Sequence, residues 1–340
     1  MFIFVEANAQ GRGILLPCND KYLEYALENL QILRGKHGTS LPIEIWHSGD
    51  ELSETSKELL KFFAPISFQD IAAITGENPK QFRGWQIKGF AVGYTNFDEI
   101  ILIDADLILF QNVEKLFDHP GYVSTGAFLF RDQTWSCQGG TKKTSCCRVY
   151  ADPYYYQRKQ FLNSLIETPS EYLPLEWGHY WDPLTRPTPE QKISVDEGES
   201  GCVVIDRRRH EKGVQKIVEL NRDYKTTYKY FWGDKETYWV AFEIEKEPYT
   251  VNREFPKTYF AKSFAPESRV DIVQFIDGIP FYQQKKIKKP TAHPQFIDLD
   301  FQTHPLEITD YRGHFRYLTR EEIDQFNELF FLSNTFHEGL

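Results

Sequence analysis

Two acidic residues, Asp104 and Asp106, lie in the most hydrophobic segment of the chain, EIILIDADLILF (residues 99–110). We expect this segment to be a strand, with the Asp-x-Asp at the carboxyl end of its residues 100–103, and the alternation of side chains along a strand would direct both carboxylates to one crevice. Burial of two carboxylates is unfavourable unless something compensates it. Ligands bind at the carboxyl ends of strands in open α/β sheets, and paired carboxylates suit a hard divalent cation that itself holds phosphate oxygens. The alternative is a turn with capping Asp residues.

Three chemistries use such a pair of carboxylates. A metal-dependent glycosyltransferase would bridge them to a nucleoside diphosphate leaving group through the cation. An aspartyl-phosphate phosphatase of the HAD type would use the first Asp as its nucleophile. That class is less favoured, because Leu107 and Ile108 replace the expected small pair and Tyr238 replaces a later Asp. A glycoside hydrolase, with two carboxylates flanking a sugar, would not explain an acidic metal site on a parallel strand.

Alternating strand and helix signals position this pair in the first 120 residues. We expect strands at 12–18, 42–48 and 99–110, helices at 20–38, 53–65 and 80–97, and a further strand at 121–132. This order predicts an α/β fold with a mixed, mostly parallel central sheet and helices on both faces. The pattern resumes with a strand at 200–209 and helices at 212–224 and 233–245. Strands at 269–276, 278–285 and 295–301 and a helix at 319–334 follow.

The region from about 133 to 200 interrupts this pattern. It contains a cysteine-rich loop, a helical segment at 152–166 and a proline-rich stretch. We therefore predict one domain over residues 1–340. Its parts are residues 1–130, an insertion (131–200), and residues 201–340 with C-terminal strands; the family resemblance given below implies that the first is a nucleotide-sugar-binding half and the last an acceptor-binding half.

Composition limits the partners of the chain. The 340 residues carry a net charge of -10, which argues against a nucleic-acid polymer as a partner. Hydrophobic residues make up 41% of the chain, which supports a packed core. Aromatic residues make up 16% of the chain. They can fill the core and the surface, and the more specific role is stacking against flat or ring-shaped ligands.

The start of the chain and its cysteines say little about chemistry. No apolar run is long enough to span a membrane, and the opening residues match neither a signal peptide nor an anchor. We expect a protein that is soluble as given. It would be cytoplasmic or, as the family resemblance given below implies, a Golgi-luminal domain without its anchor. For Cys137, Cys146 and Cys147 we favour free thiols or one local disulfide over a zinc site.

The segment FRGWQIKGFAVGYTNFDEIILIDADLILFQNVEKLFD (residues 82–118) resembles the donor-binding core of the GT-A glycosyltransferases. It is most similar to the fungal-type α-mannosyltransferase family that extends N-glycan outer chains and O-glycans. It is more distantly similar to the glycogenin and galactosyltransferase-like family. STGAFLFRD, GCVVID and GDKETYW also match, so the resemblance covers roughly residues 80–245. It implies a GT-A, Rossmann-like fold and the transfer of a hexose, mannose favoured, to a glycan hydroxyl with retention of configuration.

The resemblance also implies roles for individual residues. Asp104 and Asp106 would hold Mn²⁺, with Mg²⁺ as the alternative, and the donor diphosphate. His293 would complete the metal shell, with His304 as a weaker candidate. Other donor-binding candidates lie on the helix before the Asp-x-Asp strand, and they are Lys88, Gln86 and Arg83.

Asp234 would face the acceptor or the reacting carbon, and the alternative is that it only caps a helix. Glu199 is a second catalytic candidate and Ser200 an acceptor contact. Aromatic side chains that would stack on acceptor sugars, if they do not simply pack in the core, are Trp177, Tyr180, Trp181 and Trp232.

The donor would be GDP-mannose, with a UDP-sugar as the main rival. The alternative to an enzyme is a non-catalytic sugar-binding domain of the same fold.

Overall fold

The computed structural model describes residues 11–82, 84–132, 134–135, 153–174, 193–194, 198–254, 256–260, 269–284, 307–309 and 315–317. The strands are β1 (Arg12–Pro17), β2 (Ile43–His47), β3 (Ile66–Asp70), β4 (Glu99–Ile103), β5 (Leu107–Leu109), β6 (Ala127–Arg131), β7 (Thr134–Trp135), β8 (Ile193–Ser194), β9 (Gly198–Asp206), β10 (Thr250–Val251), β11 (Lys257–Phe260), β12 (Arg269–Ile276), β13 (Ile279–Gln284), β14 (Glu307–Thr309) and β15 (Phe315–Tyr317). The α-helices are α1 (Leu23–Gln31), α2 (Glu54–Leu60), α3 (Ile71–Thr75), α4 (Gln86–Tyr94), α5 (Pro120–Thr125), α7 (Pro153–Leu165), α8 (Glu211–Arg222), α9 (Tyr224–Thr227) and α10 (Thr237–Glu245). Short 3-10 or π turns accompany them at η1 (Asp20–Tyr22), η2 (Ile32–Lys36), η3 (Gly49–Glu51), η4 (Lys61–Phe63), η5 (Pro79–Phe82) and η6 (Val113–Asp118).

The main sheet has seven strands in the order β10-β6-β9-β4-β1-β2-β3. Its pairs β4–β1, β1–β2, β2–β3 and β10–β6 are parallel, whereas β9 runs antiparallel to both β4 and β6. A second sheet, in the order β15-β14-β11-β12-β13-β5, is antiparallel. The mixed, mostly parallel sheet predicted from the sequence is therefore confirmed.

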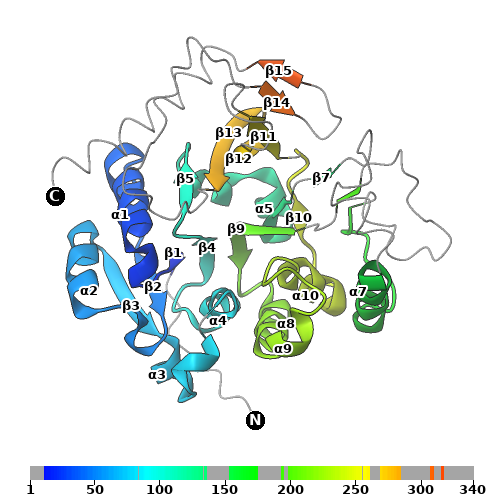
Figure 1. Cartoon of the computed structure of the whole chain (residues 1–340), viewed down its shortest axis with the longest axis horizontal. Coiled ribbons are helices and arrows are strands. Elements are labelled where there is room, and N and C mark those ends of the chain that lie inside the picture. The colour runs from blue at the N-terminus through cyan, green and yellow to red at the C-terminus, as the bar shows by residue number, and fades with distance from the viewer. Residues whose placement is uncertain are drawn as a thin grey trace.

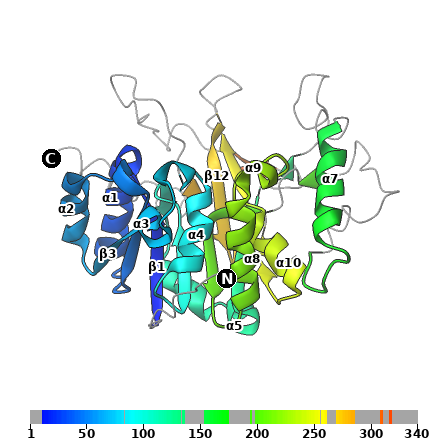
Figure 2. The same cartoon turned by 90° about the horizontal axis from the view of Figure 1, so that it is seen from below.

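Helices cover both faces of the main sheet (Figure 1). Along β4, Ile100 and Leu102 pack on one face against α4, α8 and α10, while Ile101 and Ile103 pack on the other. The second face contacts α1, α5 and the second sheet. The turned view shows α4, α8 and α10 side by side in one layer (Figure 2). Because both faces are covered, β4 reads as an unbroken apolar run rather than an alternating one.

The segment predicted as one strand over 99–110 is two strands in different sheets. β4 ends at Ile103, the chain turns through residues 104–106, and β5 pairs antiparallel with β13. The apolar residues of both strands are buried, so the hydrophobic pattern runs through the turn without a visible break. The Asp-x-Asp sequence thus lies where the chain passes from one sheet to the other.

The prediction of a strand over 121–132 is wrong in its first half. Residues Pro120–Thr125 form α5, since Pro120 occupies the first turn and the His119 side chain accepts a hydrogen bond from the Gly121 amide. Gly126, with φ of 82°, ends the helix before β6 begins. The predicted elements at 295–301 and 319–334 lie outside the described residues.

Helix α4 packs closely on α8 through glycines. A Cβ added to Gly89 would lie 2.3 Å from Asn221 Nδ2 and 2.9 Å from Asn221 Cβ. The Asn221 side chain is buried and donates hydrogen bonds to the Ile217 carbonyl and to Thr237 Oγ1. It therefore links α8 to α10 and has little freedom to move. Gly89 is next to Lys88, so this close approach also fixes where the Lys88 side chain begins.

We predict that Gly89→Ala lowers the free energy of unfolding by about 1–3 kcal/mol, because the added methyl overpacks the helix contact. Gly35→Ala is the matched control. Gly35 lies in η2 with open space around its Cα, and there the substitution should be neutral or should stabilise by up to about 1 kcal/mol. Urea unfolding measures both variants, and an equal effect at the two positions would refute the packing argument.

Candidate active site at the end of β4

The ammonium group of Lys88 is the centre of a buried cluster of charges. Its Nζ lies 2.9 Å from Asp104 Oδ1 and 3.1 Å from Asp234 Oδ2. It also donates hydrogen bonds to the carbonyl and the hydroxyl of Ser200, at 3.0 and 2.9 Å. The Lys88 side chain is buried, as are Ser200 and Asp234, whereas the Asp104 side chain keeps 24% of its surface exposed. Asp104 is thus the member of the cluster that faces outward.

Separate elements bring these residues together. Lys88 lies in the first turn of α4, Ser200 lies on β9, and Asp234 precedes α10. The antiparallel register of β4 and β9 pairs Ile103 with Cys202, and the Asp104 amide continues the ladder by donating to the Gly201 carbonyl at 2.8 Å. That pairing places Ser200 beside the Asp-x-Asp turn. The sheet therefore positions the carboxylate, and the helix supplies the cation.

Electrostatics keeps Lys88 charged. Burial and the positive end of the α4 dipole both disfavour an ammonium group at this place. The carboxylates of Asp104 and Asp234 more than offset burial, so the pKa of Lys88 is raised above its ordinary value. Breaking a buried pair of this kind by removing one partner is strongly destabilising. The cluster is consequently a structural constraint as well as a candidate site.

The Asp104 carboxylate is crowded by negative charge. Burial raises the pKa of Asp104 most, and Asp106 and Asp234 raise it further, against the opposing effect of Lys88. A second cation next to Asp104 would relieve this crowding. Two carboxylates within three residues also supply the oxygen ligands that Mn²⁺ or Mg²⁺ prefers. The residues present therefore fit a divalent cation, although the described residues contain no group of three or more His, Cys, Asp or Glu side chains arranged to hold one.

Asp234 does not cap α10 with its side chain. Its backbone carbonyl accepts hydrogen bonds from the Thr237 amide and hydroxyl, whereas its carboxylate contacts Lys88 and accepts a hydrogen bond from the Tyr238 hydroxyl at 3.0 Å. Burial and then the charge of Asp234 raise the pKa of Tyr238 well above its ordinary value, so this hydroxyl stays a donor. The alternative that Asp234 only caps a helix therefore explains the contacts of its backbone carbonyl and not those of its carboxylate.

Glu199 belongs to a neighbouring ion-pair cluster. Its Oε1 accepts a hydrogen bond from the Gly201 amide at 2.6 Å, and its Oε2 lies 3.4 Å from Lys235 Nζ. The same ammonium group lies 2.7 Å from Asp132 Oδ2. Lys235 follows Asp234 directly, so two adjacent residues of one turn hold two neighbouring clusters.

Three other predicted site residues have contacts or exposure that neither support nor exclude their expected roles. The Gln86 side chain is buried and donates to the Gln81 carbonyl at 2.6 Å, which ties it to the preceding turn η5. Trp232 is 65% exposed and so is not part of the core. Asp106 lies near enough to Tyr25 for its charge to raise the pKa of that phenol, after burial. These residues stay predictions for donor, acceptor and metal binding respectively.

Several predictions fall outside the described residues. They concern the metal ligand candidates His293 and His304, the donor candidate Arg83, the aromatic residues Trp177, Tyr180 and Trp181, and the thiols of Cys137, Cys146 and Cys147. The other two cysteines, Cys18 and Cys202, are buried free thiols.

The structure adds residues that the sequence did not single out. Asn29 on α1 is buried and donates from Nδ2 to the Ala105 carbonyl at 2.7 Å, so it holds the Asp-x-Asp turn from the opposite side. Nothing in the helical pattern around Asn29 signals this contact. Asp132 and Lys235 form the second cluster. Both lie in matching segments, Asp132 at the end of STGAFLFRD and Lys235 within GDKETYW, so the resemblance is the signal that could have found them.

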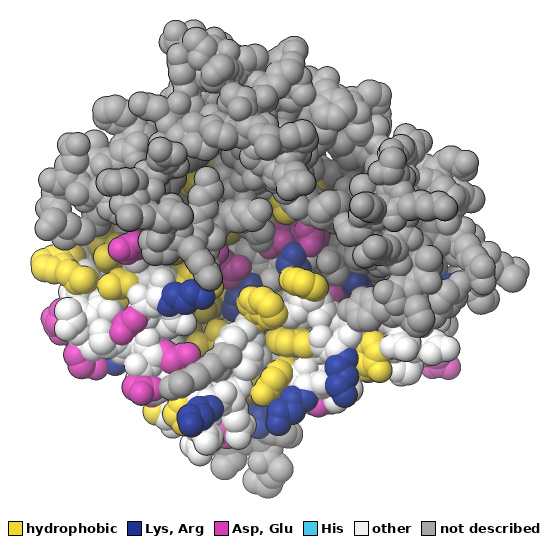
Figure 3. Space-filling view, viewed as in Figure 1, with side chains coloured by type: hydrophobic (Ala, Val, Ile, Leu, Met, Phe, Trp, Pro, Cys, Tyr) yellow, Lys and Arg dark blue, Asp and Glu magenta, His cyan; other side chains and the backbone are white. Residues whose placement is uncertain are grey.

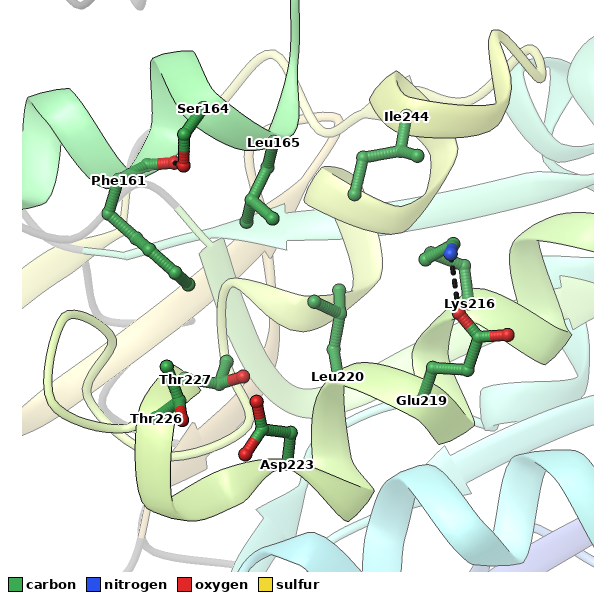
Figure 4. A pocket seen from close by; sticks show the side chains of 10 residues that line it. All are labelled: Phe161, Ser164, Leu165, Lys216, Glu219, Leu220, Asp223, Thr226, Thr227 and Ile244. Atoms are coloured by element: carbon green, nitrogen blue, oxygen red, sulfur yellow. Dashed lines mark hydrogen bonds and ion pairs between the residues drawn. The ribbon is translucent and has the colours of Figure 1, made fainter.

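A hollow of about 430 Å³ lies apart from this cluster, between α7, α8, α9 and α10 (Figure 4). Its lining residues are Phe161, Ser164, Leu165, Lys216, Glu219, Leu220, Asp223, Thr226, Thr227 and Ile244. None of them is a predicted site residue, and Lys216 pairs there with Glu219. In the part of the chain that the structure describes, no helix is both long and apolar enough to cross a membrane.

Comparison with known proteins supports the resemblance noted in the sequence. The chain is 26% identical over 249 residues to "Putative alpha-1,3-mannosyltransferase MNN14" of Candida albicans, a match that covers 70% of this chain and 34% of that protein. It is 25% identical over 252 residues to alpha-1,3-mannosyltransferase MNT3 of Saccharomyces cerevisiae, covering 72% and 39%. The chain thus spans only about a third of the length of such relatives.

Among solved structures, the chain is similar to core-mannan synthase A from Aspergillus fumigatus in its Mn/GDP form. That similarity has a TM-score of 0.45 and 9% sequence identity, and it covers 70% of this chain and 71% of the other. A similarity of this size carries no inference about ligands of the present chain.

One family model covers most of the chain and includes every residue of the Lys88 cluster. It is described as "Mannosyltransferase putative" and matches residues 11–269. Because this match extends over well more than half of the 340 residues, the chain belongs to that mannosyltransferase family.

Proposed function

We propose that the chain is a metal-dependent glycosyltransferase that moves a hexose, with mannose favoured, from a nucleoside-diphosphate sugar to a hydroxyl group of a glycan. The observation that carries this proposal is that Asp104 and Asp234 both contact the same buried Lys88 ammonium group. One carboxylate belongs to the Asp-x-Asp turn and the other to the turn before α10. Membership of the mannosyltransferase family supports the choice of mannose.

The donor diphosphate would bind at the Asp-x-Asp turn. Asp104 and Asp106 would hold Mn²⁺, or alternatively Mg²⁺, which when bound would act as a Lewis acid on the departing diphosphate. Lys88 adds a fixed positive charge at the same place, with its ammonium already oriented by Ser200. The residues around the turn can therefore neutralise an anion although the chain as a whole is acidic.

Asp234 would act on the side of the reacting sugar. Its carboxylate is held by Lys88 and Tyr238, so it is fixed in one orientation before substrate arrives. A fixed carboxylate there can hydrogen-bond an acceptor hydroxyl and stabilise positive charge that develops on the sugar ring. We propose that transfer retains the anomeric configuration, as the family resemblance implies. Glu199 is the second candidate for a catalytic carboxylate.

GDP-mannose is the favoured donor, and a UDP-sugar is its main alternative. A non-catalytic sugar-binding domain would bind free sugars without a metal or a nucleotide. An Asp-x-Asp phosphatase would instead hydrolyse a phosphomonoester in the presence of Mg²⁺. Binding of diphosphates in the presence and absence of metal separates these functions.

We predict that GDP stabilises the protein only when Mn²⁺ is present, by about 2.7 kcal/mol at a ligand concentration 100 times its dissociation constant. Asp104→Asn and Asp106→Asn should abolish this stabilisation, since each removes a charge that holds the metal. Thermal unfolding with GDP or UDP, with and without Mn²⁺, measures the effect and identifies the base.

Asp118→Asn is the matched control, because Asp118 is an exposed carboxylate at the end of η6. It should leave the ligand-induced stabilisation unchanged. Full stabilisation of the Asp104 and Asp106 variants would contradict the proposed donor site, and stabilisation by free mannose alone would favour the sugar-binding domain.

We also predict that Asp234→Asn lowers the rate of transfer to a mannoside acceptor by about 100-fold or more while leaving metal-dependent GDP binding in place. The substitution keeps the size of the side chain and removes the charge that we propose acts on the reacting sugar. Glu199→Gln should lower the rate less, because its carboxylate is paired with Lys235 rather than with the Lys88 cluster. Initial rates with saturating donor measure both, and a larger loss in Glu199→Gln would reverse the two roles.

A further inference from the structure

Two tryptophan side chains beside the Lys88 cluster are largely exposed. Trp85 is 57% exposed and Trp232 is 65% exposed. Other large exposed apolar side chains of the described residues, such as Phe62 on η4, stand singly, and single exposed apolar residues are ordinary on protein surfaces. Tryptophan is usually much more buried. The surface in Figure 3 shows hydrophobic side chains gathered near the centre of the described face, with acidic and basic side chains next to them.

The backbone joins both tryptophans to the charged cluster. Trp85 immediately precedes α4, and its carbonyl accepts a hydrogen bond from the Lys88 amide at 3.1 Å. Trp232 is separated from Asp234 by Gly233 alone. Trp85 is thus three residues from Lys88 and Trp232 is two residues from Asp234, and Lys88 Nζ lies 3.1 Å from Asp234 Oδ2.

Gly233 brings the two segments into contact. Its φ is 75°, in the left-handed region that favours glycine, and a Cβ added there would lie 2.8 Å from Trp85 Cε3 and 2.9 Å from Cδ2. The Trp85 ring thus packs against the backbone of the turn that carries both Trp232 and Asp234. This contact covers part of the ring and fixes it, while more than half of the side chain stays open to solvent.

The sheet topology places the turn with Trp232 to one side of the expected nucleotide position. In the main sheet β4 lies between β1 and β9, and ligands of doubly wound sheets bind at the carboxyl ends of the strands where the strand order reverses, here between β1 and β4. The turn with Trp232 and Gly233 follows α8 and α9 and belongs to the β9 side. Trp232 therefore starts two residues before Asp234, the carboxylate assigned to the reacting sugar, and Trp85 packs against the same turn.

We propose that Trp85 and Trp232 together form a stacking surface for the sugar ring of the acceptor, an inference that rests on the proposed function. One face of a hexose ring presents C–H groups that pack on a flat indole, while its hydroxyl groups remain free for hydrogen bonds. Binding sites of this type combine aromatic walls with a few fixed polar groups. Asp234 lies two residues after Trp232, and Asp104 of the same cluster keeps 24% of its side chain exposed, so a sugar stacked there would bring a hydroxyl toward the charged cluster.

The test compares Trp85→Ala and Trp232→Ala with the wild type in transfer from GDP-mannose to α-methyl mannoside. Each substitution should raise the KM for the acceptor by about 10-fold, since it removes an aromatic contact. The KM for the donor should stay within about twofold in the same variants. Trp85→Phe and Trp232→Phe keep a flat ring and should retain most of the affinity for the acceptor. Thermal unfolding midpoints show that each variant compared is folded.

Phe62→Ala is the matched control, because Phe62 is an aromatic side chain that is 84% exposed in η4 and has no part in the cluster. It should leave both KM values unchanged. An unchanged acceptor KM in both alanine variants would overturn the stacking surface and leave the transferase proposal intact. A rise in the donor KM alone would overturn it as well, by assigning the indoles to the nucleotide.

A binding measurement without donor keeps the two proposals distinguishable. Titration of the wild type with α-methyl mannoside should change its tryptophan fluorescence, and Trp85→Ala and Trp232→Ala should weaken the response, whereas Phe62→Ala should not. This response in a protein that transfers no mannose would support the stacking surface and refute the proposed reaction. If the protein transfers mannose but neither alanine substitution changes the fluorescence response or the acceptor KM, the proposed reaction is supported and the stacking surface is refuted.

Discussion

The buried ammonium group of Lys88 is held between two carboxylates that come from distant parts of the chain. Neither burial nor the positive end of α4 favours a cation there, so the charge persists only because Asp104 and Asp234 surround it. The same contact ties α4, the end of β4 and the turn before α10 to one point. Loss of Lys88 would leave two carboxylates without their cation, and loss of either carboxylate would remove one of the two that offset the burial of Lys88. Stability and the arrangement of the candidate site therefore depend on one set of contacts.

The passage of the chain between the two sheets creates the place where this contact forms. Residues 104–106 leave the main sheet and enter the antiparallel one, with the Asp104 amide bonded to Gly201 and the Ala105 carbonyl bonded to Asn29. Backbone groups on both sides of the turn are thus satisfied by neighbours rather than by the carboxylates. The Asp104 carboxylate is therefore used in the contact with Lys88 rather than in holding the turn. A turn held in this way has its geometry set before any ligand arrives.

Two ion-pair clusters, each made of one lysine and two carboxylates, adjoin each other through consecutive residues. Asp234 faces Lys88, while Lys235 faces Glu199 and Asp132. Glu199 and Ser200, also consecutive, lie on the facing strand and divide between the same two clusters. Such pairing couples the position of Asp234 to that of β9. Trp85 packs on the Gly233 turn, which lies between Trp232 and Asp234 in the sequence, and both indoles are more than half exposed.

The sequence by itself determined the fold class and the identity of the central acid pair. Unbroken apolar runs such as residues 100–103 require helices on both faces, and two Asp residues in such a run need a compensating partner. It also pointed to Lys88 and Asp234 separately. Only the tertiary structure decided that these two side chains meet, that residues 104–106 turn rather than continue a strand, and that Asn29 and Lys235 take part. The reason is physical: hydrophobic patterns report which residues are buried, whereas a contact across a fold depends on strand order and helix packing, which leave no local signal.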